Sequence, residues 1–290
     1  MHIFKKYRLF CRFLFTKCEF YVKMNTSKFS FKEAVMNYEF LNKLLSNKDG
    51  GVLFTCFGLW HLIYLALVFG ATVFIICKLK DKTQEIKSKA LSTAVSIAFG
   101  LYMADFFLMP FAYGEIDIDK LPFHACTSMC ILSFAARHSK SLYKYRLQFA
   151  LIGMIANIVY LVYPQVLHDS YLSYKSIQTL LFHGCMTAYG IMTLALDDVK
   201  PEWKKCYREL VLLAILTLWA LLGNTLYSGE LGDYSHNFNW FFVKRDPFGA
   251  LDESISRYVM PFLTPICFFG MDLIIYSIYF GIKKAFKKKA

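Results

Sequence analysis

The stretch GLWHLIYLALVFGATVFIIC, residues 58–77, decides the fold of this chain. It contains no Asp, Glu, Lys or Arg. An α-helix needs about 20 mostly apolar residues to cross the hydrocarbon core of a bilayer. A lone strand in lipid would leave its backbone groups unpaired. The stretch therefore predicts a transmembrane helix.

Similar apolar blocks recur along the chain and predict seven transmembrane helices, at about 52–78, 90–113, 121–136, 146–163, 174–196, 208–228 and 257–282. The composition agrees, because 57% of the residues are hydrophobic and only 19% are charged, against about a half and a quarter in soluble domains. We expect an all-α, polytopic membrane helix bundle over residues 51–284. A basic tail, 285–290, follows it.

The net charge of +12 does not indicate a nucleic-acid partner, because the Lys and Arg lie between the apolar blocks. The six loops carry five, one, four, one, four and two Lys or Arg when the residues at the span edges are included, apart from Arg257, which starts the last span. The C-terminal tail carries five. By the positive-inside rule, this alternation predicts a cytoplasmic C-terminus and an N-terminus outside.

The N-terminal tail, residues 1–50, opposes that topology with ten Lys and Arg, six of them before Met24. Two interpretations remain open. Either translation starts at Met24 rather than Met1, or the first segment lies on a membrane surface as a basic amphipathic element. Apolar positions in Phe31–Leu45 have helical spacing, so we expect an interfacial helix there.

Polar side chains within the predicted spans gather at one depth. At about 1.5 Å per residue, groups from the first six spans fall in the outer half of the membrane, whereas Asp272 lies deeper. Such groups are either satisfied by hydrogen bonds between helices or line a polar cavity. The shared layer favours a cavity open to the outer side. Its members are His61, Asp105, Cys126, Asn157, Gln178, His183 and Asn224.

Cys126 and His183 come from different spans at overlapping depths. An imidazole that takes the thiol proton creates a thiolate, the nucleophile of covalent catalysis. Cys130 lies one turn further along and would be a second thiol on the same face. The alternative is that these cysteines are small packing residues.

Two His-x-Cys pairs, at His124 and His183, raise the possibility of a metal site. Residues two apart project to nearly opposite faces of a helix, so each pair would supply one ligand at most. We expect no metal and no cofactor. The chain also lacks the phosphate-binding, dinucleotide-binding and metalloprotease motifs.

Four segments in order resemble a known family. They are Leu121–Cys126 (LPFHAC), Leu180–Gly184 (LLFHG), Leu222–Asn224 (LGN) and Asn239–Pro247 (NWFFVKRDP). Together they resemble the YwaF-like integral membrane proteins, a family that includes the eukaryotic transmembrane protein 164, over roughly residues 50–282. The resemblance implies a seven-helix membrane protein. In the eukaryotic branch it implies a phospholipid acyltransferase with a membrane-embedded Cys and His, which fall on Cys126 and His183.

The first hypothesis is therefore a phospholipid acyltransferase or acyl hydrolase that works through a Cys126 thioester, with His183 as base. Its partners are membrane lipids, either phospholipid or lysophospholipid. The membrane is the plasma membrane in a bacterium and the endoplasmic reticulum in a eukaryote. Supporting roles fall to oxyanion donors and to cations that hold a lipid phosphate. The predicted donors are His124, Asn224 and Asn239, and the cations are Lys244 and Arg245.

The second hypothesis is a non-enzymatic transporter or ligand-binding bundle. Its coupling groups would be the intramembrane Asp105, His61 and Asp272. A Cys126 within reach of His183 favours the first hypothesis. A continuous path between Asp105 and Asp272 favours the second.

Overall fold

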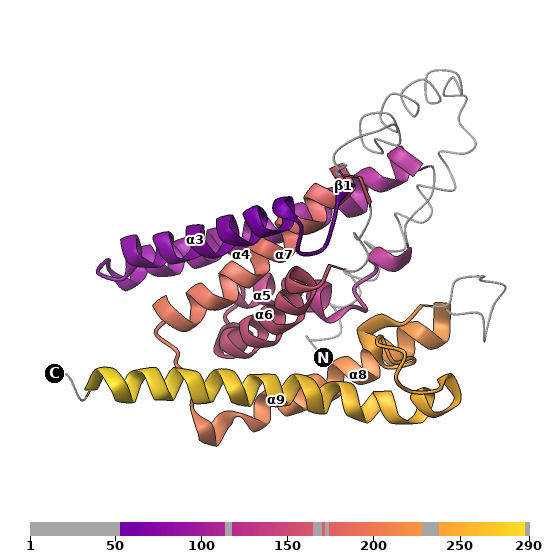
Figure 1. The fold of residues 1–290 in the computed structure, drawn as a ribbon. Helices are drawn as coiled ribbons and strands as arrows, with labels where there is room; N and C mark the ends of the chain where they lie inside the picture. The colour runs from indigo at the N-terminus through magenta and orange to yellow at the C-terminus, as the bar shows by residue number, and fades with distance from the viewer. Residues whose placement is uncertain (1–52, 114–117, 165–169, 172–173, 228–237, 288–290) are drawn as a thin grey trace, which may run out of the picture.

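The computed structural model describes residues 53–113, 118–164, 170–171, 174–227 and 238–287. These residues form a helical bundle (Figure 1). The predicted interfacial helix, the two candidate start sites and most of the C-terminal tail lie outside the described residues. The α-helices are α3 (Leu59–Leu79), α4 (Gln84–Tyr113), α5 (Ala125–His138), α6 (Arg146–Val162), α7 (Tyr174–Leu196), α8 (Tyr207–Tyr227) and α9 (Glu253–Lys287).

Six of these helices are long and apolar enough to cross a membrane, so six of the seven predicted spans are confirmed. The exception is α5, the third predicted span. It has 14 residues, or about 21 Å at the usual rise, which is shorter than a hydrocarbon core of about 30 Å. It begins only at Ala125 because turns occupy the residues around Pro122. The prediction of seven spans is therefore confirmed for six helices and is not confirmed for α5.

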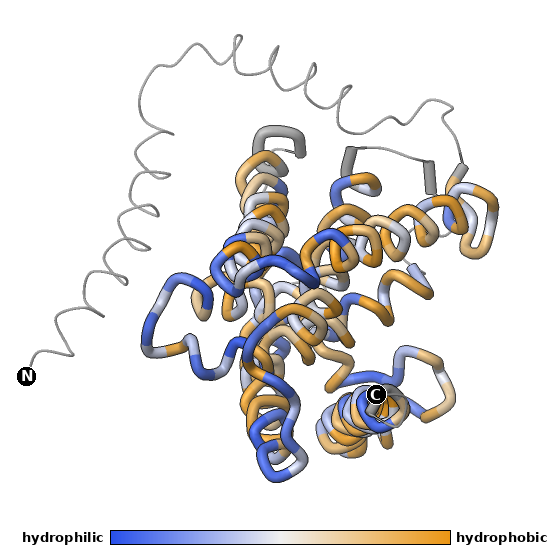
Figure 2. The backbone as a smooth tube through the Cα atoms, turned by 90° about the vertical axis from the view of Figure 1, so that its left-hand side faces the viewer, coloured by the Kyte–Doolittle hydropathy of each residue, from blue (hydrophilic) through white to orange (hydrophobic). Residues whose placement is uncertain are grey.

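The Lys- and Arg-rich connections share one end of the bundle. Gln84 at the start of α4 donates to the Leu196 carbonyl at the end of α7. The α5–α6 connection meets the same place, because Arg137 and Arg146 both bind Asp197. The described end of α9 lies at this end too (Figure 1). Figure 2 looks onto it, and the connections there are hydrophilic. We call it the basic end.

The centre of the bundle is the pair α6 and α7, which α4 and α5 cover. Two glycines on these helices allow neighbouring helices to pack closely against them. A Cβ at Gly153 would lie 3.1 Å from the Met129 side chain of α5, and one at Gly190 would lie only 2.4 Å from Met154 of α6. In contrast, α3 faces outward along most of its length, and only His61 and Thr72 are buried.

A buried ion cluster stabilises the basic end. Asp197 accepts from Arg137 at 2.5 Å and from Arg146 at 3.1 Å, and all three side chains are at most 3% exposed. Arg137 also donates to the hydroxyl groups of Tyr189 and Thr193 on α7. Buried charges need partners of this kind, because an unpaired one is costly.

The opposite end holds two smaller elements. Strand β1 (Leu53–Phe54) pairs antiparallel with β2 (Ser170–Tyr171), and so joins the chain before α3 to the chain before α7. The 3-10 turn η5 (Trp240–Phe242) buries Trp240 completely. Phe241 and Phe242 have positive φ angles of 56° and 52°, a conformation that costs about 1–2 kcal/mol per residue. The described part of the sixth predicted loop thus folds back against the bundle.

Candidate functional site

Cys126 lies in the first turn of α5 and is half-buried. The first N–H groups of a helix have no partner within the helix. The sulfur of Cys126 interacts with the N–H groups of Thr127 and of Cys126 itself. A helix N-terminus favours negative charge. These N–H groups therefore point toward the sulfur of Cys126.

His183 lies on α7 and is 6% exposed. Its Nδ1 is 2.7 Å from the Asn157 Oδ1 of α6. The Nδ2 group of Asn157 donates to the Gly153 carbonyl at 2.6 Å, which fixes the orientation of the amide. An amide oxygen only accepts, so Nδ1 of His183 carries the proton. The Nε2 atom of the neutral ring then keeps its lone pair, as a general base requires.

Tyr160 packs directly on one of the two predicted catalytic residues, His183. Its ring stacks on His183 with centroids 3.8 Å apart and an interplanar angle of 17°. It also lies close enough to Cys126 for an electrostatic interaction. His183 therefore packs on this phenol, Cys126 lies within its electrostatic range, and no hydrogen bond joins Cys126 to His183 in the described structure. Catalytic hydrogen bonds of unliganded enzymes are often long.

Lys120 brings a cation to this cluster. It lies in the turn η1 (Ile118–Lys120), and its ammonium pairs with Asp105 of α4 at 2.6 Å. The Lys120 charge interacts with both Cys126 and His183. The side chain of Asp105 is 2% exposed and that of Lys120 is 20% exposed. Asp105 therefore holds a partly accessible cation within electrostatic range of the thiol and the imidazole.

His124 precedes α5 and lies at the rim of the cluster. Its Nε2 donates to the Asp119 carboxylate at 3.3 Å, and the Trp240 indole donates to the same oxygen at 3.0 Å. Partial desolvation raises the pKa of Asp119, but the His124 and Trp240 hydrogen bonds outweigh it and hold the pKa below its usual range. His124 is also close enough to His183 for their charges to interact.

Three other predicted residues have structural contacts. Both nitrogens of His61 are engaged, by the Phe57 N–H at 2.8 Å and the Leu161 carbonyl at 2.9 Å. Asn224 donates to the Trp240 carbonyl and accepts from its N–H. The Asn239 Oδ1 atom accepts from two backbone N–H groups. Their oxyanion and ion-coupling roles stay predictions.

The predicted phosphate cations follow η5. The backbone N–H groups of Lys244 and Arg245 both donate to Asn239 at 3.0 Å, so one amide fixes the turn that carries them. For the metal alternative, the described residues contain no group of three or more His, Cys, Asp or Glu that could hold an ion. Cys130 is fully buried.

Sequence reasoning placed Asn157 in the polar layer but gave it no role, and it missed Tyr160 and Lys120. One signal was present, because residues three apart share a helix face, which puts Asn157 and Tyr160 together on α6. Lys120 is the single basic residue of the second predicted loop. The positive-inside rule does not account for a basic residue in this loop, which is predicted to lie outside. Lys120 could therefore have been singled out from the sequence.

A family model, described as the TMEM164 family, matches residues 56–281. The chain belongs to the TMEM164 family. The match confirms the resemblance that the four sequence segments suggested. With the six apolar helices, it identifies this TMEM164-family chain as a multi-pass integral membrane protein. Comparisons with curated proteins and with solved structures found no match.

Proposed function

We propose that this chain transfers an acyl group from a membrane phospholipid through a thioester on Cys126. The observation that carries the proposal is the hydrogen bond from Nδ1 of His183 to Asn157. It leaves the opposite ring nitrogen as a base in a ring that stacks on Tyr160, and Tyr160 lies within electrostatic range of Cys126. A nucleophile, a base and a group that orients the base are the parts of a nucleophilic site.

In the first half-reaction, Nε2 of His183 takes the proton of the Cys126 thiol. The sulfur attacks the ester carbonyl of the phospholipid. Collapse of the tetrahedral intermediate breaks the ester C–O bond, and His183 returns the proton to the departing lysolipid oxygen. The products are a lysophospholipid and acyl-Cys126.

In the second half-reaction, His183 takes a proton from the hydroxyl group of a lysolipid, or from water. The oxygen attacks the thioester carbonyl, the C–S bond breaks, and the thiol regains the proton. The N–H groups at the start of α5 suit the oxyanion of both intermediates. Lys120 suits the lipid phosphate, because it is partly accessible and near both reacting side chains.

The test is a thioester trap. Protein in vesicles that contain a phospholipid with a radiolabelled acyl chain should acquire a label that hydroxylamine releases. Cys126→Ala should abolish the label. His183→Ala should lower the rate of labelling by about 10²- to 10⁴-fold, the usual contribution of a positioned base.

Cys130→Ala is the matched control, because it removes a thiol one turn away on the same helix. It should keep the label. A label that survives in Cys126→Ala would refute the proposal. The absence of label from the parent with several phospholipids would refute it too, and would favour the transport hypothesis. That alternative rests on Asp272 of α9, which is 1% exposed and has no hydrogen-bond partner for either oxygen in the described structure.

Asn157→Ala should slow thioester formation by at least about tenfold, because the His183 ring loses the acceptor that sets its tautomer. The pH profile of the reaction should change as well. Asn224→Ala is the control, since that amide holds the Trp240 backbone. It should lower thermal stability and leave the pH profile unchanged. Identical pH profiles for Asn157→Ala and the parent would argue against an orienting role.

A further inference from the structure

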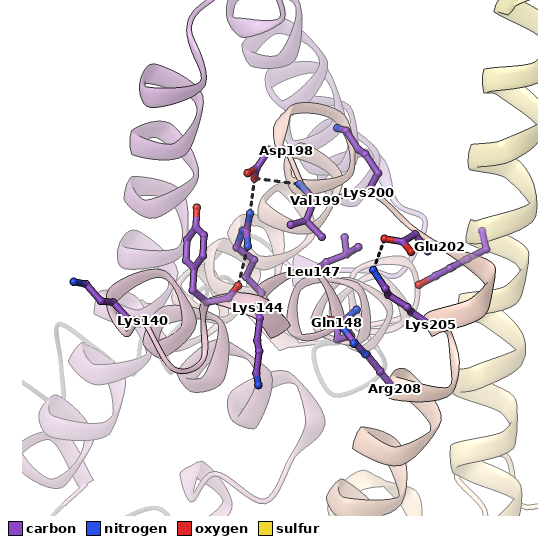
Figure 3. Close-up of a pocket in the computed structure, with 13 residues that line it drawn as sticks. Lys140, Lys144, Leu147, Gln148, Asp198, Val199, Lys200, Glu202, Lys205 and Arg208 are labelled. Atoms are coloured by element: carbon purple, nitrogen blue, oxygen red, sulfur yellow. Dashed lines mark hydrogen bonds and ion pairs between the residues drawn. The ribbon is translucent and has the colours of Figure 1, made fainter.

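A pocket of about 600 Å³ opens at the basic end, far along the helices from Cys126. The pocket is lined by the α5–α6 connection, the start of α6, the α7–α8 connection, the start of α8 and one residue of α9 (Figure 3). Six basic side chains face two acidic ones. The basic residues are Lys140, Lys144, Arg146, Lys200, Lys205 and Arg208, and the acidic residues are Asp198 and Glu202.

Both acidic side chains of the lining are already paired. Asp198 accepts from Arg146, and Glu202 accepts from Lys205 at 2.5 Å. Lys200 is also engaged, because its ammonium donates to two carbonyls at the end of α7, at 3.2 and 3.3 Å. Three of the six basic residues, Arg146, Lys200 and Lys205, therefore already have partners.

The other three cations, Lys140, Lys144 and Arg208, form no salt bridge in the described part of the chain, although the charge of Arg208 interacts with the adjacent Glu209. Arg208 lies beside Gln148, and the side chains of Lys140 and Lys144 extend away from the other labelled residues (Figure 3). The excess positive charge suits a ligand with more than one negative charge. A phosphate monoester carries nearly two, and an Arg binds it with two parallel hydrogen bonds.

We propose that this pocket binds a multiply phosphorylated headgroup. Its place at the end of the spans favours an anionic membrane lipid, since basic pockets between transmembrane helices commonly bind such headgroups. A soluble phosphate compound presents the same chemistry, and the experiment separates the two sources. The site is independent of the proposed acyl transfer, because Cys126 lies at the other end of α5.

The test uses the full chain in detergent micelles and a fluorescent short-chain phosphatidylinositol bisphosphate. The parent should bind it at least about tenfold more tightly than a phosphatidylcholine of the same chain length, and salt should weaken the binding. The double variant Lys144→Gln/Arg208→Gln should lose about tenfold or more in affinity.

The matched control is Lys80→Gln/Lys89→Gln, which removes two exposed lysines at the same end but outside the lining. It should bind like the parent. An equal loss in the control would refute the pocket in favour of general charge attraction, as would equal affinity for both lipids. If the first double variant does not fold, Lys140→Gln/Lys144→Gln replaces it, because both side chains extend away from the other labelled residues of the pocket (Figure 3).

Competition by soluble inositol trisphosphate shows whether the pocket takes its phosphate groups from a membrane lipid or from a soluble compound. Displacement of the lipid shows that phosphate groups alone are recognised. No displacement, together with specific lipid binding, shows that the site takes the headgroup only from a lipid. Both results support the pocket. An inositol trisphosphate that displaces the lipid from the parent and the double variant equally would contradict it.

Discussion

Asp197→Ala should lower the free energy of unfolding by about 3–5 kcal/mol, the usual cost of removing one partner from a buried ion pair. The carboxylate accepts from Arg137 and Arg146 in a site where every side chain is at most 3% exposed. Without it, the Arg137 guanidinium stays buried with no countercharge, and Arg146 keeps only the exposed carboxylate of Asp198. The measurement is the denaturation midpoint in micelles.

Asp198→Ala is the matched control, because its neighbouring carboxylate binds Arg146 but is 57% exposed. Exposed pairs contribute about 0–1 kcal/mol, so its midpoint should change little. Equal losses in the two variants would contradict the buried cluster as the source of stability.

The same cluster predicts sensitivity to acid. Burial raises the pKa of Asp197, but the charges and hydrogen bonds of Arg137 and Arg146 outweigh it and hold the pKa well below its usual range. A lowered folded-state pKa contributes stability that is present above the unfolded-state value of about 3.9 and is lost as the pH falls through the folded-state value. Asp197→Ala should therefore flatten the acid limb of the stability curve.

Gly190→Ala should destabilise the bundle by about 1–3 kcal/mol or more, the usual cost of overpacking. The new methyl group would lie 2.4 Å from the Cβ of Met154 and 2.9 Å from the Ala150 carbonyl, so α6 and α7 must separate. Because Met154 lies one turn from Asn157, the separation should also slow the thioester reaction.

Gly70→Ala provides the comparison, since nothing lies within 4 Å of a Cβ there. Alanine is favoured over glycine in a helix by up to about 1 kcal/mol, so this variant should be as stable as the parent or slightly more stable. A Gly190→Ala variant as stable as Gly70→Ala would rule out close contact of the central helices.

The six long helices could be predicted because length and hydropathy are local properties of the chain. The short length of the helix in the third predicted span could not be predicted, because its apolar block includes the turns around Pro122 and the helix lies among other helices. A helix inside a bundle does not need the length that crosses lipid. Its short extent depends on neighbours that the local pattern does not contain.

The candidate site was predictable in depth but not in detail. Cys126, Asn157 and His183 were expected at one level, since the rise per residue gives height. Their pairing depends on the rotation of each helix, and helices that are apolar all round do not reveal it. Arg137, Arg146 and Asp197 were missed for another reason. Charges between spans serve as topology signals, and nothing local distinguishes those that tertiary contacts bury.

The outward-facing α3 has a consequence for how the chain assembles. Although α3 is joined to α4 by a short turn, it packs mainly against α7, and its Tyr64 hydroxyl donates to the Leu180 carbonyl. Two other contacts near the start of α3 also form with later residues: β1 pairs with β2, and His61 binds the Leu161 carbonyl. These partners are synthesised about a hundred residues later. During synthesis α3 is therefore made before α7, the helix against which it finally packs, and is surrounded by lipid until then. The extreme apolarity of residues 58–77 makes it stable alone until α7 arrives.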